Sequence, residues 1–140
     1  MRETSMSFAT TQAGPEPRTL SADKVRLAMQ GFFQIMELWG ATNLEMRRIL
    51  GSPAERTFYQ WKSGVVRTVP DDTIRRIGYI AGIYKALQIV YSNPAQSDEW
   101  LRKPNRFFGG QTPLERMAAG DVTDLAAVRQ YADAARSPWS

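Results

Sequence analysis

The fold of this chain is decided by residues 42–64, which read TNLEMRRILGSPAERTFYQWKSG. Thr42 precedes Glu45 by three positions, a capping box in which the two side chains satisfy free backbone N–H groups at a helix start. After a glycine, residues 52–55 repeat this pattern with proline at the first helical position, which favours a second helix to about Lys62. The stretch therefore predicts two short helices joined by a tight turn.

A helix is predicted on each side of this pair. On the N-terminal side, Ser21 can cap a helix that Gly40 ends, whereas residues 1–20 are rich in Thr, Ser, Pro and Gly and predict a disordered arm. Apolar residues recur at three- or four-residue spacing in that helix, at Val25, Ala28, Met29, Phe32, Met36 and Trp39. On the C-terminal side, residues 71–91 are apolar around most of a helix, which indicates the central helix of the core.

The remaining residues predict three shorter helices and one loop. The helices begin at Asn93, Thr112 and Asp121, each of which can cap a helix, and the last one ends near Arg136. The loop covers residues 104–111 and contains two adjacent phenylalanines and two glycines. The sequence therefore predicts an all-α fold of about seven helices, with no strand.

The charged residues are unevenly distributed. The net charge is +4, and residues 41–85, with eight basic and four acidic groups, account for the whole excess. A localised basic excess favours contact with the phosphate backbone of DNA. Residues 21–69 are therefore interpreted as a helix-turn-helix DNA-binding region, followed by a central helix and a smaller helical region over residues 70–140. The alternative is a helical hairpin whose outer residues are polar only for solubility.

The second helix of this motif is the one expected to enter the major groove. Arg56 can reach guanine edges and Gln60 adenine edges, while lysine and arginine nearby suit phosphates. The predicted DNA-contacting residues are Glu55, Arg56, Thr57, Tyr59, Gln60, Lys62 and Arg67. We expect a dimer, because one short recognition helix reads few base pairs. Arg47 stands where a small residue usually packs against the recognition helix.

Composition restricts catalysis. The chain contains no Cys and no His, which excludes thiol nucleophiles, Ser-His triads, zinc fingers and His-ligated metals. The carboxylates that remain near one another, Glu115, Asp121 and Asp124, occupy helix-capping positions, so we expect no enzyme, no cofactor and no metal. No secretory signal and no apolar stretch of about 20 residues is present, which predicts a cytoplasmic protein with no membrane contact.

Two segments resemble a known family. Residues 22–64 are similar to the Xre-type helix-turn-helix of the Xre/MbcA/ParS antitoxins, and residues 100–114, WLRKPNRFFGGQTPL, resemble their toxin-binding domain. The second likeness continues through Val128-Arg129-Gln130-Tyr131 to Arg136. The resemblance implies an antitoxin of a two-gene pair whose partner is a RES-domain toxin, similar to ADP-ribosyltransferases, that consumes NAD⁺. It also implies that the antitoxin covers the toxin's active site and that the complex represses its own promoter.

The same likeness implies a set of toxin contacts, which are Trp100, Asn105, Phe107, Phe108, Arg129, Tyr131 and Arg136. From the residues alone, the aromatic side chains either anchor an interface or fill the core of a small domain. A stand-alone helix-turn-helix regulator, whose C-terminal half dimerises or binds another partner, is the alternative function. A gene for a RES-type toxin beside this one would separate the two.

The C-terminal part of the chain has balanced charge, with six basic and six acidic groups in residues 86–140. It therefore has no electrostatic reason to touch DNA. We expect the final helix and the tail, residues 137–140, to project into the toxin. DNA binding and toxin binding should then be separable along the chain.

Overall fold

The computed structural model describes residues 20–136, which form seven α-helices and one 3-10 helix, with no strand in that range. The prediction of an all-α fold with about seven helices is confirmed. The tail at 137–140 and the predicted arm, apart from Leu20, lie outside the described residues. The elements are α1 (Ala22–Trp39), α2 (Asn43–Ile49), α3 (Glu55–Lys62), α4 (Asp71–Val90), α5 (Pro94–Arg102), η1 (Arg106–Phe108), α6 (Pro113–Met117) and α7 (Val122–Ala135).

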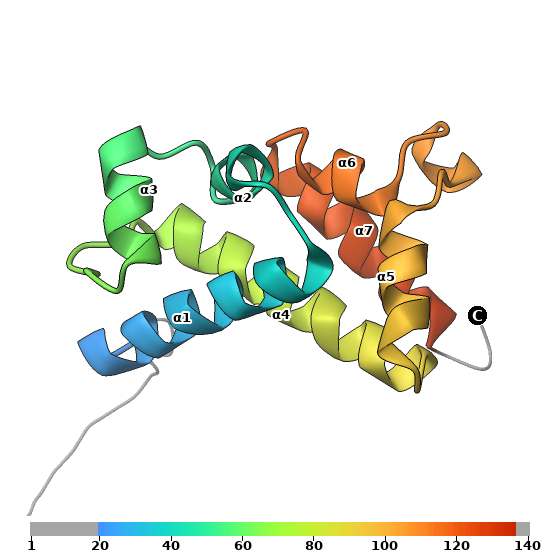
Figure 1. Cartoon of the computed structure of the whole chain (residues 1–140), viewed down its shortest axis with the longest axis horizontal. Helices are drawn as coiled ribbons and strands as arrows, with labels where there is room; N and C mark the ends of the chain where they lie inside the picture. Colours follow the sequence, from blue (N-terminus) through green and yellow to red (C-terminus); the bar gives the residue numbers. More distant parts are fainter. Residues whose placement is uncertain (1–19, 137–140) are drawn as a thin grey trace, which may run out of the picture.

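Helix α4 is the central helix, as its composition predicts. It packs against α7 along one side and against α1 along another, and the short helices α2, α3, α5 and α6 surround this layer (Figure 1). Ile80 and Ile83 on α4 are completely buried. Burying a side chain of this size contributes about 1.5–3 kcal/mol, so α4 provides the main support for both neighbours. None of the described helices is long and apolar enough to cross a bilayer.

One hydrophobic core extends across the whole described chain. It runs from Met29 and Phe32 on α1, through Phe58 on α3, to Leu125 and Val128 on α7. The core is therefore continuous across the predicted boundary between residues 69 and 70. The regions that the sequence assigns to two functions are packed as one body.

The helix starts follow the predicted capping pattern at most positions. Thr42 accepts from the Glu45 N–H at 3.1 Å while Glu45 accepts from the Thr42 N–H at 2.8 Å, and Thr112 forms the same box with Glu115. Asp121 caps α7 in the same way. These local interactions place the helix starts where the sequence predicts them.

The capping box predicted at residues 52–55 is wrong. Helix α3 begins at Glu55, its N-cap residue is Ala54, and no side chain caps it. Ser52 has φ 57°, a left-handed conformation in which its side chain does not cap α3. Arg47 stabilises this turn, because its Nε donates to the Pro53 carbonyl at 2.7 Å. The long arginine at this position therefore reaches the turn before α3, and it lines a groove beside Glu55 and Phe58 of that helix.

Candidate functional site

The outer face of α3 carries most of the predicted DNA contacts. Phe58 and Trp61 are buried against the core and fix the orientation of the helix. Four of the predicted residues are exposed on α3 and a fifth in the loop that follows it: Glu55, Arg56, Tyr59, Gln60 and Arg67. In Figure 1 the helix lies at one end of the long axis of the molecule, with no described element covering its outer side. This geometry leaves the outer face of α3 open to solvent.

Two predicted residues lie off this face. Thr57 is half-buried and lines a groove together with Pro53, Thr68 and Pro70. Lys62 is turned toward the start of α2, where its Nζ donates to Asn43 Oδ1 at 2.5 Å. Lys62 is therefore held beside the start of α2, and Thr57 is not on the outer face of α3.

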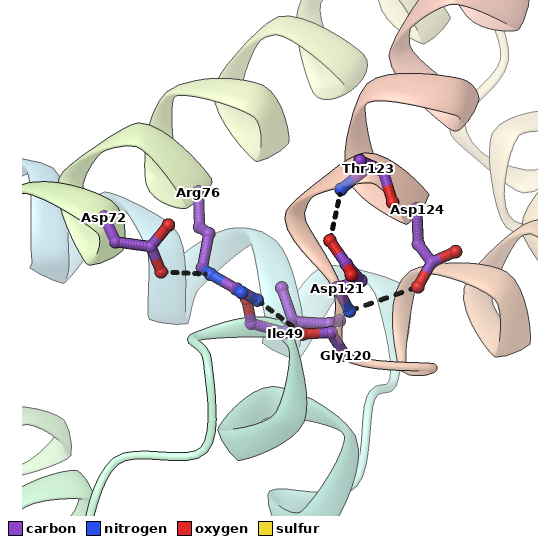
Figure 2. Close-up of polar contacts among 7 residues, drawn as sticks. All are labelled: Ile49, Asp72, Arg76, Gly120, Asp121, Thr123 and Asp124. Atoms are coloured by element: carbon purple, nitrogen blue, oxygen red, sulfur yellow. Dashed lines mark hydrogen bonds and ion pairs between the residues drawn. The ribbon is translucent and has the colours of Figure 1, made fainter.

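Part of the basic excess is internal. Arg76 on α4 is only 8% exposed and occupies the centre of Figure 2. Its Nε donates to Asp72 Oδ2 at 2.7 Å, and its Nη1 donates to the carbonyl oxygens of Gly120 at 2.9 Å and Ile49 at 3.3 Å. Arg76 thus satisfies carbonyl groups at the end of α2 and in the turn before α7, and it is not available to DNA.

Arg102 makes a second connection of this kind. It donates to the carbonyl oxygen of Trp39 at the end of α1, where Gly40 leaves room for its guanidinium group. The two arginines therefore join helices α1 and α2 to the C-terminal half. The turn before α7 is further defined by Asp121, whose Oδ1 accepts from the Thr123 N–H at 3.0 Å. This hydrogen bond, assisted by the charge of Arg76, holds the pKa of the Asp121 carboxyl below its ordinary value.

An aromatic cluster lies at the other end of the molecule, beside η1. Tyr131 on α7 stacks with Phe107 at 4.7 Å and with Trp100 at 6.1 Å between ring centroids, and Phe108 meets it edge-on at 5.5 Å. Phe108 is buried, but Phe107 is 63% exposed. One phenylalanine therefore fills the core, while its neighbour faces solvent.

Asn105 organises the loop that presents Phe107. Its side-chain oxygen accepts from the Phe107 N–H at 2.9 Å, and its own N–H donates to the Gln111 carbonyl at 3.0 Å. Gly109 and Gly110 both have positive φ, which closes the loop behind η1. Asn105 thus holds the shape of the loop.

Arg129 and Arg136 lie on a different side of α7 from Tyr131. A step of two residues turns a helix by about 200°, so Arg129 faces α4 while Tyr131 faces η1. Arg129 donates from Nε to Asp133 Oδ2 at 3.0 Å, and Arg136 Nη1 lies 3.8 Å from Asp133 Oδ1. Arg129 and Tyr131 are partly buried against neighbouring elements, whereas Arg136 is exposed, and the tail at 137–140 lies outside the described residues.

Comparison with known proteins identifies this half of the chain. Residues 86–137 match the model of the antitoxin Xre/MbcA/ParS C-terminal toxin-binding domain. The chain belongs to the Xre/MbcA/ParS antitoxin family. The antitoxin is also 39% identical, over 123 residues, to a Sinorhizobium fredii protein named "Uncharacterized protein y4oB", a match that covers 88% of this chain and 94% of the relative.

The toxin-binding domain of this antitoxin begins in the last turns of α4 and includes α5, η1, α6 and α7. It therefore contains the whole aromatic cluster and the Arg129–Asp133 pair, but not Gly82 or Arg76. Sequence reasoning missed Arg76, which joins α2 to the turn before α7, and Gly82, where a Cβ would overlap the guanidinium group of Arg129. A glycine inside the long helix was the available signal for Gly82, while nothing local distinguishes Arg76 from Arg75.

Proposed function

We propose that this antitoxin neutralises a RES-domain, NAD⁺-consuming toxin by covering its active site, and that it represses its own promoter through α3. The carrying observation is an exposed Phe107, supported from behind by Tyr131, inside the matched toxin-binding domain. We assign no catalytic role to the chain and place its activity in the cytoplasm.

The toxin contact centres on the aromatic cluster. An exposed aromatic ring that is already held in place loses little conformational freedom on binding, which makes it an effective interface anchor. Phe107 contacts the toxin directly, Trp100 and Tyr131 flank it, and Asn105 and Phe108 hold the loop. Arg129 and Arg136 contribute a charged edge on the other side of α7.

The experiment is co-expression of the antitoxin with the product of the neighbouring toxin gene, followed by co-purification and a growth assay. Phe107→Ala should lose toxin binding and growth rescue. Leu27→Ala is the matched control, since Leu27 on α1 is also 63% exposed but lies in the N-terminal half. Equal binding by both variants would remove Phe107 from the interface.

The DNA contact rests on α3. Its exposed Arg56, Tyr59 and Gln60 suit base edges, and Lys62 and Arg67 suit phosphates. We propose that a homodimer within the toxin–antitoxin complex presents two such helices, because one reads too few base pairs. Affinity for the promoter should then fall steeply with salt, with a log–log slope of about −0.9 per phosphate contact.

The same measurements separate the alternative function. A chain that binds its promoter with this salt dependence, but neither co-purifies with the neighbouring gene product nor rescues growth, would be a stand-alone transcriptional regulator. A chain that rescues growth but ignores promoter DNA would be an antitoxin without autorepression.

A further inference from the structure

Helix α4 contains two glycines with different surroundings, Gly78 and Gly82. Glycine inside a helix costs stability relative to alanine, so each position calls for a reason. A Cβ added at Gly78 would meet nothing within 4 Å. A Cβ added at Gly82 would overlap Nη1 and Cζ of Arg129 and would lie 2.7 Å from its Nε. The guanidinium group of Arg129 therefore occupies the space that a side chain at position 82 would fill.

Arg129 is held at one edge of its guanidinium group. Asp133 accepts from Nε at 3.0 Å, and Gly82 receives the Nη1 side of the group. Within residues 20–136, no hydrogen bond is formed by Nη1 or Nη2. Nη2 is the nitrogen farthest from Gly82, and the side chain is 37% exposed. The group is thus fixed at its base and keeps free N–H donors.

Such an arrangement suits a carboxylate. Two guanidinium groups, those of Arg129 and Arg136, lie beside the single carboxylate of Asp133. Nη2, which lies against neither Asp133 nor Gly82, keeps N–H groups that can donate charge-assisted hydrogen bonds to a carboxylate. Holding the group in place beforehand removes part of the side-chain entropy that an arginine otherwise loses on binding.

We propose that Gly82 is a positioning residue for toxin recognition, which holds Arg129 ready to bind a carboxylate on the toxin. The inference rests on the proposed function, in which Arg129 contacts the toxin. The proposal adds Gly82 of α4, which lies outside the matched domain, to the residues that support toxin binding.

The test compares Gly82→Ala with Gly78→Ala in the full-length antitoxin, bound to a catalytically inactivated toxin from the neighbouring gene. The end of an arginine side chain moves easily, so Gly82→Ala should displace Arg129 without unfolding the chain. We expect Gly82→Ala and Arg129→Ala each to weaken toxin binding about tenfold, and Gly78→Ala to leave it unchanged.

A double mutant separates positioning from a general structural role. In the Arg129→Ala background, Gly82→Ala should have no further effect on toxin affinity, because the group that it displaces is absent. An equal loss in both backgrounds would show that Gly82 only shapes α4, and would overturn the proposal.

A measurement on the free antitoxin tests the positioning role of Gly82 separately from toxin binding. NMR relaxation of the Arg129 Nε–H group in the free antitoxin should show an ordered side chain in the wild type and in Gly78→Ala, and a mobile one in Gly82→Ala. Order that persists in Gly82→Ala overturns the positioning role itself. If Gly82→Ala loses this order but binds the toxin as tightly as the wild type does, the positioning role is also overturned. A wild-type chain that binds no toxin overturns the proposed function instead.

Discussion

Arg76 donates a hydrogen bond of 2.9 Å from Nη1 to the carbonyl oxygen of Gly120, a residue 44 positions later in the chain. The same nitrogen donates to the carbonyl of Ile49, so one buried guanidinium group connects the end of α2, the first turns of α4 and the turn before α7 (Figure 2). The position of α2 therefore depends on a contact with the turn before α7.

Arg76→Met should destabilise the chain by about 1–3 kcal/mol, because it removes the donors of a buried network while keeping a similar volume. Arg75→Met is the matched control, since Arg75 is exposed on the same helix. Urea unfolding of the two variants makes the comparison. Similar midpoints for both would show that the Arg76 network contributes little.

Arg56→Ala and Gln60→Ala should each cost about 1–3 kcal/mol on the promoter site and relax sequence preference there. Lys62→Ala should instead weaken binding to all sequences and reduce the salt slope by about one unit. Thr57→Ala serves as a control, because Thr57 lies off the outer face of α3. Titrations against promoter and random DNA at several salt concentrations test this; a uniform loss in all four variants would contradict it.

Truncation should distinguish the tail from the last helix. A chain that stops after Ala135 keeps all of α7 and should remain folded and bind DNA. We still expect it to lose toxin protection, because Arg136 and the tail are removed. A chain that stops before Val122 loses Leu125, Val128 and Ala132 from the core and should unfold. Circular dichroism, promoter binding and growth rescue are measured for the full chain and the two truncated chains. A folded chain without α7 would contradict the single core.

Asp121 predicts how stability changes in acid. Its pKa is lowered in the folded state by the hydrogen bond from Thr123, so the stability that Asp121 contributes is fully present above the unfolded-state pKa, about 3.9, and is lost as the pH falls through the folded value. Asp121→Asn keeps a capping side chain but does not titrate. Its unfolding midpoint should therefore change less between pH 7 and pH 3 than that of the wild type, and an identical change in both proteins would rule out a contribution from Asp121.

The sequence predicts helix starts well where the capping partners are close in the chain. Thr42 and Glu45, or Thr112 and Glu115, are three residues apart, and nothing distant alters their geometry. The Ser52 box fails because its geometry is set by a left-handed turn that Arg47 holds from outside the four-residue pattern. Local patterns therefore fix helix starts only where no tertiary contact competes.

The roles of the arginines are the least predictable part of the site. Arg75 and Arg76 are identical residues at adjacent positions, yet one is exposed and the other is enclosed by carbonyl groups from segments far away in the sequence. Arg129 lies over Gly82 only because α7 packs against α4. A count of charges places every arginine in solvent or on DNA. It cannot identify the buried ones, because burial depends on contacts between segments that are distant in the sequence.

The continuous core determines which parts of such antitoxins are exchangeable by recombination. A crossover between residues 69 and 70 would combine α1 of one protein with α4 of another, so that Met29 and Phe32 would meet a core shaped for different side chains. Arg56, Tyr59 and Gln60 are exposed on α3, so they can be replaced without changing a buried position of the core. If α3 binds the promoter as proposed, new operator preferences should therefore arise by point substitutions on α3 rather than by exchange of whole domains.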